Sequence, residues 1–173
     1  MNLKEEIREI QDYPKEGINF KDITTLINNP KALNYVIDSV VDEFKEKGIT
    51  KVVGLEARGF IFGGAIAANL KAGFVPIRKK NKLPATVVSE TYELEYGTDV
   101  VEMHVDAVGE NDVVLIHDDL LATGGSALAA LNLVKQRGAK QIYFSFICDL
   151  EFIATPKKDE ILKYDNQILV KYP

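Results

Sequence analysis

The stretch from residue 112 to residue 126 constrains the fold of this chain more than any other part of the sequence. It begins with the apolar, β-branched run Val113 to Ile116, which is typical of a strand buried on both faces. The acidic pair Asp118 and Asp119 follows, and a turn of small residues, 122 to 126, then leads into a helical pattern. This order of strand, acidic pair, small-residue turn and helix predicts a ligand site in an α/β protein.

The chemistry of the ligand follows from the order of these parts. A turn that leads into a helix presents backbone N–H groups without intrahelical partners, and the helix dipole adds positive charge, so the turn suits a phosphate. Asp118 and Asp119 would repel the same phosphate. They must therefore face either the vicinal hydroxyls of a sugar or a hard cation such as Mg²⁺. A ligand with a phosphate at one end and a diol beside it is a ribose 5-phosphate.

The composition and length exclude several other classes of protein. A chain of 173 residues with 46% hydrophobic and 27% charged residues is expected to form one soluble globular domain. The net charge of −5 argues against a nucleic-acid partner. Cys148 is the only cysteine, so no internal disulfide forms, which fits a reducing compartment, and we expect it to be a buried apolar filler. No apolar run reaches the roughly 20 residues of a membrane span, and the charged start is no signal peptide, so we expect a cytoplasmic protein without a membrane partner.

Hydrophobic periodicity predicts strands that alternate with helices. The turn 156 to 159 is expected to be polar and irregular, and Asn29-Pro30 is expected to begin a helix that Gly48 ends. Residues 88 to 94 and 100 to 105 alternate in polarity around Gly97 and predict a β-hairpin. Strands are predicted at 51 to 55, 74 to 77, 113 to 116, 141 to 147 and 167 to 172, and helices at 3 to 10, 30 to 47, 60 to 70 and 126 to 137.

Two further segments have the chemistry of anion sites. Arg58 and Gly59 follow the first predicted strand and begin a helix, so Arg58 is placed to bind phosphate oxygens, although a surface arginine is the alternative. Four cations follow the next strand within residues 78 to 82. Such a run is by itself more often a solvated turn than a site.

Residues 118 to 126 resemble the phosphoribosyl-diphosphate binding motif of the type I phosphoribosyltransferases, in the form found in members that act on adenine. The other nucleotide-binding motifs, G-x-x-x-x-G-K-[ST] and G-x-G-x-x-G, are missing. The resemblance implies a single α/β domain, residues 1–173, with a central, mainly parallel sheet flanked by helices, a small hood (about residues 1–30) and a flexible β-hairpin loop (about residues 79–105). It also implies purine salvage: transfer of the 5-phosphoribosyl group from phosphoribosyl diphosphate to adenine, giving AMP and pyrophosphate, with Mg²⁺ as cofactor, in a homodimer.

The resemblance also implies which residues bind the activated sugar. Asp118 and Asp119 are expected to hold the ribose hydroxyls and to act in catalysis. Mg²⁺ is expected to be held mainly by the substrate and water, without a direct protein ligand. The peptide bond between Glu56 and Ala57 is expected to be cis. The expected phosphate-binding residues are Ala122, Thr123, Gly124, Gly125 and Ser126, and the expected diphosphate-binding residues are Ala57, Arg58, Arg78, Lys79 and Lys82.

The resemblance places the base beside the segment from residue 18 to residue 24. Phe20 is expected to pack against adenine, while main-chain groups of Asn19 and Lys21 read its edge. Glu95 is expected to be the general acid/base, next to Tyr96 in the hairpin loop.

This sequence departs from the family pattern at several positions. Lys21 stands where an arginine is usual, Thr25 where a proline is frequent, and Thr155-Pro156 where the family commonly has Gly-Arg. His117 replaces a small apolar residue, and it is expected to be either a strand-end residue with a satisfied ring or a pH-sensitive neighbour of the acidic pair.

Two alternative functions remain open from the sequence. Ala122 occupies the place where enzymes for hypoxanthine and guanine have an aspartate that accepts a hydrogen bond from the ring N7–H, which favours adenine over another base. A non-catalytic sensor of phosphoribosyl diphosphate would keep the binding turn, but such regulators usually carry a DNA-binding segment, for which this chain has no room.

Overall fold

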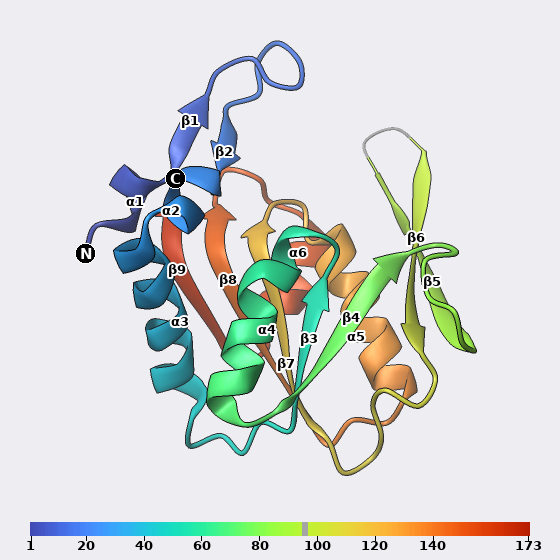
Figure 1. Cartoon of the computed structure of the whole chain (residues 1–173). Helices are drawn as coiled ribbons and strands as arrows, with labels where there is room; N and C mark the ends of the chain where they lie inside the picture. The colour runs from blue at the N-terminus through green and yellow to red at the C-terminus, as the bar shows by residue number, and fades with distance from the viewer. Residues whose placement is uncertain (95–96) are drawn as a thin grey trace.

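A seven-stranded sheet forms the centre of the computed structural model, which describes residues 1–94 and 97–173. Its spatial order is β5-β6-β4-β3-β7-β8-β9 (Figure 1). The five strands from β4 to β9 in this order run parallel, whereas β6 pairs antiparallel with both β4 and β5. The predicted, mainly parallel sheet is therefore confirmed. The strands are β3 (Lys51–Leu55), β4 (Gly73–Lys79), β5 (Val87–Glu93), β6 (Thr98–His104), β7 (Val113–Leu121), β8 (Gln141–Leu150) and β9 (Asn166–Tyr172).

Helices cover both faces of this sheet and bury a separate apolar core on each. On one face lie α3 (Pro30–Phe44) and α4 (Arg58–Leu70), whose core includes Val36 and Phe62. On the other face lie α5 (Gly125–Gln136) and α6 (Pro156–Leu162), whose core includes Leu131 (Figure 1). No helix in the described part of the chain is both long enough and apolar enough to cross a membrane.

The helix α3 shows how local sequence sets an element. The Asn29 side chain accepts a hydrogen bond from the Lys31 N–H at 3.0 Å, and Pro30 occupies the first helical position, so both start signals act as predicted. Gly48 follows the helix in the left-handed region, at φ +69°. The buried face is formed by Ala32, Val36, Ile37, Val40 and Phe44.

The N-terminal segment forms a small layer of its own beyond the carboxyl ends of the parallel strands (Figure 1). It contains α1 (Leu3–Glu6), β1 (Arg8–Ile10), β2 (Phe20–Asp22) and α2 (Thr24–Asn28), with β1 and β2 paired antiparallel. The helix predicted over residues 3 to 10 is wrong beyond Glu6, because Arg8 to Ile10 are extended and pair with β2. Apolar spacing along eight residues does not contain this distant partner, and pairing overrides local propensity.

Two other predictions need correction near the carboxyl ends of the strands. The strand β7 runs to Leu121, so the acidic pair lies within the end of the strand and does not follow it. Residues 156 to 159, predicted as a turn, begin α6. Thr155 caps this helix by accepting the Lys158 N–H at 3.1 Å, and Pro156 occupies the first helical position.

Candidate active site

The acidic pair lies where β7 ends, between β3 and β8. Asp119 is buried, with 3% of its surface exposed, and its N–H donates to Asp118 Oδ1 at 2.9 Å. Burial, together with the neighbouring carboxylate, raises the pKa of Asp118 well above its usual range. Burial also raises the pKa of Asp119, and the Arg58 guanidinium opposes that shift. A ligand that brings hydrogen-bond donors or positive charge would therefore favour the ionised pair.

The turn after β7 presents the first amides of α5. Gly124 is the N-cap residue and lies in the left-handed region at φ +82°, a conformation that a side chain would strain. The Gly125 N–H reaches Thr123 Oγ1 at 3.4 Å, and the first regular helical bond runs from the Leu128 N–H to the Gly124 carbonyl. No side chain caps α5 in the described part of the chain. This turn, residues 122 to 126, is called the phosphate turn below.

Arg58 begins α4 and joins two parts of the molecule that are distant in sequence. Its Nε atom lies 3.0 Å from Asp119 Oδ2, and its guanidinium lies 5.4 Å from the centre of the Phe20 ring. The preceding bond, Glu56 to Ala57, is cis, as the resemblance implies. A Cβ atom on Gly59 would lie 2.9 Å from the His117 carbonyl oxygen, so only glycine lets α4 approach β7 this closely.

One pocket of about 190 Å³ combines these parts. Arg58 lines it from α4 and the acidic pair from β7, while the phosphate turn closes it. Positive charge, negative charge and free amides thus face one small volume. The lining residues are Arg58, Asp118, Asp119, Leu120, Leu121, Ala122, Thr123, Gly124, Ser126 and Ala127.

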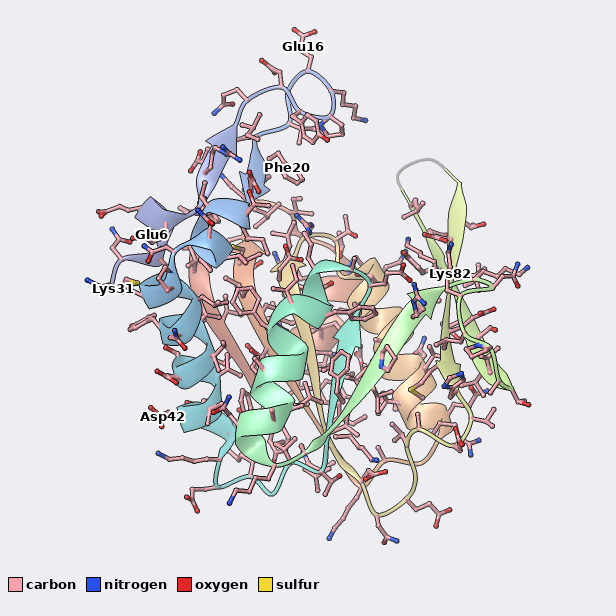
Figure 2. The ribbon with its side chains drawn as sticks, in the orientation of Figure 1. Glu6, Glu16, Phe20, Lys31, Asp42 and Lys82 are labelled. Atoms are coloured by element: carbon pink, nitrogen blue, oxygen red, sulfur yellow. The ribbon has the colours of Figure 1, made fainter. Side chains whose placement is uncertain are left out.

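The basic residues expected to follow the second strand do not line this pocket. Arg78 and Lys79 are the last residues of β4, which runs further than predicted, and both contact Glu56 in the loop before α4. Arg78 Nε lies 3.4 Å from Glu56 Oε2, and the Lys79 N–H donates to the same oxygen at 2.8 Å. The Lys79 ammonium is paired with Asp99. Lys82 lies in the loop between β4 and β5, on the side of the molecule away from Phe20 (Figure 2).

The segment expected to hold the base lies above the end of the sheet, on the small layer formed by β1 and β2 (Figure 2). Phe20 is half-buried and meets Tyr13 edge to face at 5.2 Å. Asn19 donates from Nδ2 to Glu9 Oε2 at 2.6 Å. Lys21 is buried, and its ammonium lies 3.0 Å from Glu9 and 4.1 Å from the centre of the Tyr172 ring. Since these contacts occupy the Lys21 side chain, its main chain is the part left to meet a base.

Glu95 and Tyr96, the two loop residues predicted to act in the site, lie outside the described residues. The strand that leads to them approaches the phosphate turn. Tyr92 and Glu93 line a second pocket, of about 630 Å³, together with Thr123 and Ser126. The end of β5, the first strand of the hairpin, therefore lies beside the phosphate turn.

Sequence reasoning missed the contribution of α6. Thr155 Oγ1 donates to the Thr123 carbonyl at 2.5 Å, and Lys157 Nζ lies 3.0 Å from Glu93 Oε2. Lys158 is buried and pairs with the buried Asp149 at the end of β8. Thr155-Pro156 is the same kind of helix start as Asn29-Pro30, so this signal in the sequence could have located α6, although not its contacts.

His117 and Cys148 lie in the core next to the site. His117 is fully buried, with Nδ1 3.3 Å from Ser145 Oγ, and burial lowers its pKa to about 4. It is therefore neutral at neutral pH, which argues against the pH-sensitive alternative. Cys148 is buried as expected, and burial raises the pKa of its thiol to about 12.

The side chains of this pocket suit Mg²⁺ only when a bound ligand shares in holding the ion. No group of three or more His, Cys, Asp or Glu side chains within residues 1–94 and 97–173 is placed to hold a metal ion. Asp118 and Asp119 offer the hard oxygen ligands that Mg²⁺ prefers, but Asp119 is already paired with Arg58. The pair thus suits an ion that takes most of its ligands from a bound anion and water.

Comparison with known proteins places this site in a family. The family described as "Phosphoribosyl transferase domain" matches residues 22–168. The adenine phosphoribosyltransferase of Phocaeicola vulgatus is 58% identical over 148 residues, which cover 86% of this chain and 85% of that protein. The chain belongs to the adenine phosphoribosyltransferase family. The enzyme of the same name from Clostridium tetani is 46% identical over 172 residues, 99% of each chain.

Solved structures of the adenine phosphoribosyltransferase family share the fold described above. The enzyme of Thermoanaerobacter pseudethanolicus has a TM-score of 0.92 at 44% identity, with 98% of each chain covered. The enzyme of Giardia lamblia, solved in complex with 9-deazaadenine, also has a TM-score of 0.92, at 36% identity, with 99% of this chain and 97% of that chain covered. The family and the fold class implied by residues 118 to 126 are both confirmed.

Proposed function

We propose that this protein transfers the 5-phosphoribosyl group from phosphoribosyl diphosphate to adenine, giving AMP and pyrophosphate, as a step of purine salvage. The observation that carries the proposal is the pocket in which the acidic pair, Arg58 and the phosphate turn meet. The two relatives named above are called adenine phosphoribosyltransferases, and their matches cover 86% and 99% of this chain.

The charges of the pocket set the orientation of the bound sugar phosphate. The amides of the phosphate turn, residues 122 to 126, hold the 5′-phosphate at the positive end of α5. Asp118 and Asp119 accept hydrogen bonds from the ribose hydroxyls. When the bond to the diphosphate breaks, positive charge develops on the sugar ring, and ionised carboxylates beside it stabilise that charge. Because burial raises the pKa of both carboxyl groups, the hydrogen bonds donated by a bound ribose help to keep the pair ionised.

The leaving diphosphate lies on the opposite side of the sugar, near the start of α4. Arg58 exchanges its contact with Asp119 for the diphosphate oxygens, and the Ala57 main chain lies beside it. Arg78 and Lys79 at the end of β4, with Lys82 just after it, complete the proposed diphosphate set. Mg²⁺, held mainly by the diphosphate and water, supplies further positive charge to the leaving group.

Adenine binds between the small N-terminal layer and the sugar. Phe20 packs on the base, and the main chain of Asn19 and Lys21 reads its edge. Ala122 cannot accept a hydrogen bond from N7–H, so the pocket lacks a carboxylate suited to an oxopurine. The hood, residues 1–30, therefore supplies the base specificity.

The hairpin loop, residues 79–105, supplies the acid/base group and shields the reaction. Glu95 takes up the proton that the attacking adenine must lose, an effect of about 10²- to 10⁴-fold on the rate. Closure over the sugar excludes water that would hydrolyse the activated intermediate. The homodimer and the cytoplasmic address expected from the sequence stay predictions.

An assay with three bases tests the proposal. The purified protein is incubated with phosphoribosyl diphosphate and Mg²⁺, with adenine, hypoxanthine or guanine, and pyrophosphate release is measured. Release with adenine alone supports the proposal. Release only with hypoxanthine or guanine overturns the choice of base, and no release with any base identifies a non-catalytic binding protein. Glu95→Gln tests the acid/base role against Glu46→Gln, an exposed control next to α3, and equal turnover of the two variants would remove Glu95 from the mechanism.

A further inference from the structure

The phosphate turn is held from outside the motif by α6. The backbone of Gly124 lies so close to this helix that a Cβ atom would sit 2.8 Å from the Lys158 nitrogen and 3.1 Å from the Lys157 carbonyl carbon. Main chain thus packs on main chain where α6 begins. The turn and α6 are separated by about thirty residues of sequence, so the contact is a product of the fold.

The start of α6 is in turn anchored to the sheet. The Lys158 ammonium donates to the Leu150 carbonyl at 2.7 Å and pairs with the Asp149 carboxylate, both at the end of β8. Lys158 and Asp149 are each less than 5% exposed, so the pair is shielded from water. Loss of either partner would leave a buried charge unpaired and would strongly destabilise the fold. The pair therefore holds the start of α6 on the end of β8.

Thr155 links this anchored helix to the turn with a single hydroxyl. Its Oγ1 atom accepts the Lys158 N–H at 3.1 Å, which caps α6, and donates its own hydrogen to the Thr123 carbonyl at 2.5 Å. The hydroxyl therefore uses both its donor and an acceptor site. Rotation of the side chain away from Thr123 would break this bond and uncap the helix.

The direction of one amide follows from this bond. The peptide between Thr123 and Gly124 is trans and planar, so its C=O and N–H groups point in opposite directions. Because the carbonyl is held toward Thr155, the Gly124 N–H is held away from α6. Rotation of this peptide unit is set by ψ of Thr123 and φ of Gly124, and a glycine restricts φ little, so the bond to Thr155 limits a rotation that the sequence leaves open.

We propose that Thr155 is a positioning residue for the 5′-phosphate, because its hydroxyl sets the direction of the Gly124 amide that binds the phosphoryl oxygens. The inference rests on the proposed function, in which the phosphate turn holds AMP and phosphoribosyl diphosphate by their 5′-phosphates. It assigns a role to a residue that lies outside the binding motif and outside the pocket of the acidic pair. Thr155 also lines the pocket of about 630 Å³ with Thr123 and Ser126, and its proposed effect passes through the Thr123 carbonyl.

Three variants test this role. Thr155→Val removes the hydroxyl at nearly constant volume, and Thr155→Ser restores it. Thr50→Val is the matched control, because the Thr50 hydroxyl also accepts a backbone N–H, from Val113 at 3.0 Å, and donates to Asp112 at 2.7 Å, but at the other end of the strands. The dissociation constant of AMP is measured by calorimetry, the KM values by steady-state kinetics, and the melting temperature by circular dichroism.

The expected result separates binding from stability. Thr155→Val should weaken AMP binding and raise the KM for phosphoribosyl diphosphate about five- to tenfold, which corresponds to about 1–1.4 kcal/mol, the contribution of one hydrogen bond. The KM for adenine should stay within about twofold of wild type. Thr155→Ser should restore both values, and Thr50→Val should lower the melting temperature alone.

Other results contradict the inference. Unchanged AMP binding in Thr155→Val, with a melting temperature lowered as in Thr50→Val, would show that Thr155 only stabilises the fold. A Thr155→Ser variant as weak as Thr155→Val would exclude the hydroxyl as the cause. If the wild-type protein neither binds AMP nor releases pyrophosphate with adenine, the proposed function is wrong, and this inference with it. If the wild type is active and Thr155→Val binds AMP as the wild type does, this inference alone is wrong.

Discussion

Replacement of Gly124 by alanine tests the packing of α6 on the phosphate turn most directly. A left-handed conformation costs a residue with a Cβ about 1–2 kcal/mol, and Gly124 lies at φ +82°. The new methyl group would also lie 2.8 Å from the Lys158 nitrogen, a backbone atom that cannot turn aside. Overpacking of this kind costs about 1–3 kcal/mol. The two effects together should lower the free energy of unfolding by about 2–5 kcal/mol.

Gly48→Ala is the control, because it isolates the conformational cost. Gly48 lies at φ +69°, and no atom lies within 4 Å of the Cβ that alanine would add. We expect this variant to lose only about 1–2 kcal/mol. The difference between the two variants therefore measures the contact between the turn and α6.

Urea denaturation followed by circular dichroism measures both changes. A loss of about 2–5 kcal/mol should lower the midpoint of Gly124→Ala by about 1–2 M urea, and that of Gly48→Ala by about half a molar. AMP binding should weaken in Gly124→Ala and stay unchanged in Gly48→Ala. Equal midpoints for the two variants would refute the reasoning, because they would show that α6 does not press on Gly124 in solution.

Two further changes test the charged contacts around the site. Arg58→Lys keeps the charge but loses the guanidinium that contacts Asp119 and Phe20. The KM for phosphoribosyl diphosphate should therefore rise about tenfold in steady-state assays. An unchanged KM would show that Arg58 does not bind the diphosphate. The Arg8 side chain lowers the pKa of Asp22 from 3.8 to about 2, so the ionised carboxylate stabilises the fold above about pH 4, and this stabilisation is lost as the pH falls toward 2. The free energy of unfolding of Asp22→Asn should therefore be about 1–2 kcal/mol lower than that of wild type at pH 7, and this difference should close between pH 4 and pH 2. A difference that is independent of pH would contradict the role of this pair.

The sequence alone predicted the helices and strands that are set by interactions between residues close together in the chain. The helix α3 follows from an asparagine cap, a proline at the first turn and an apolar stripe. A strand, a small-residue turn and a helix follow one another from Val113 to Gln136, although the acidic pair lies within the strand, and the family was identified from the centre of that stretch. The buried state of Cys148 was also predicted correctly.

The tertiary structure decided what depends on residues far apart in the chain. Residues 8 to 10 became a strand because residues 20 to 22 pair with them, and α6 took a place against the phosphate turn because Lys158 pairs with Asp149 on β8. The contact between Arg58 and Asp119 likewise joins the start of α4 to the end of β7. Propensity and periodicity act through neighbouring backbone bonds, whereas these contacts form only after the sheet has brought distant segments together, so no local pattern records them.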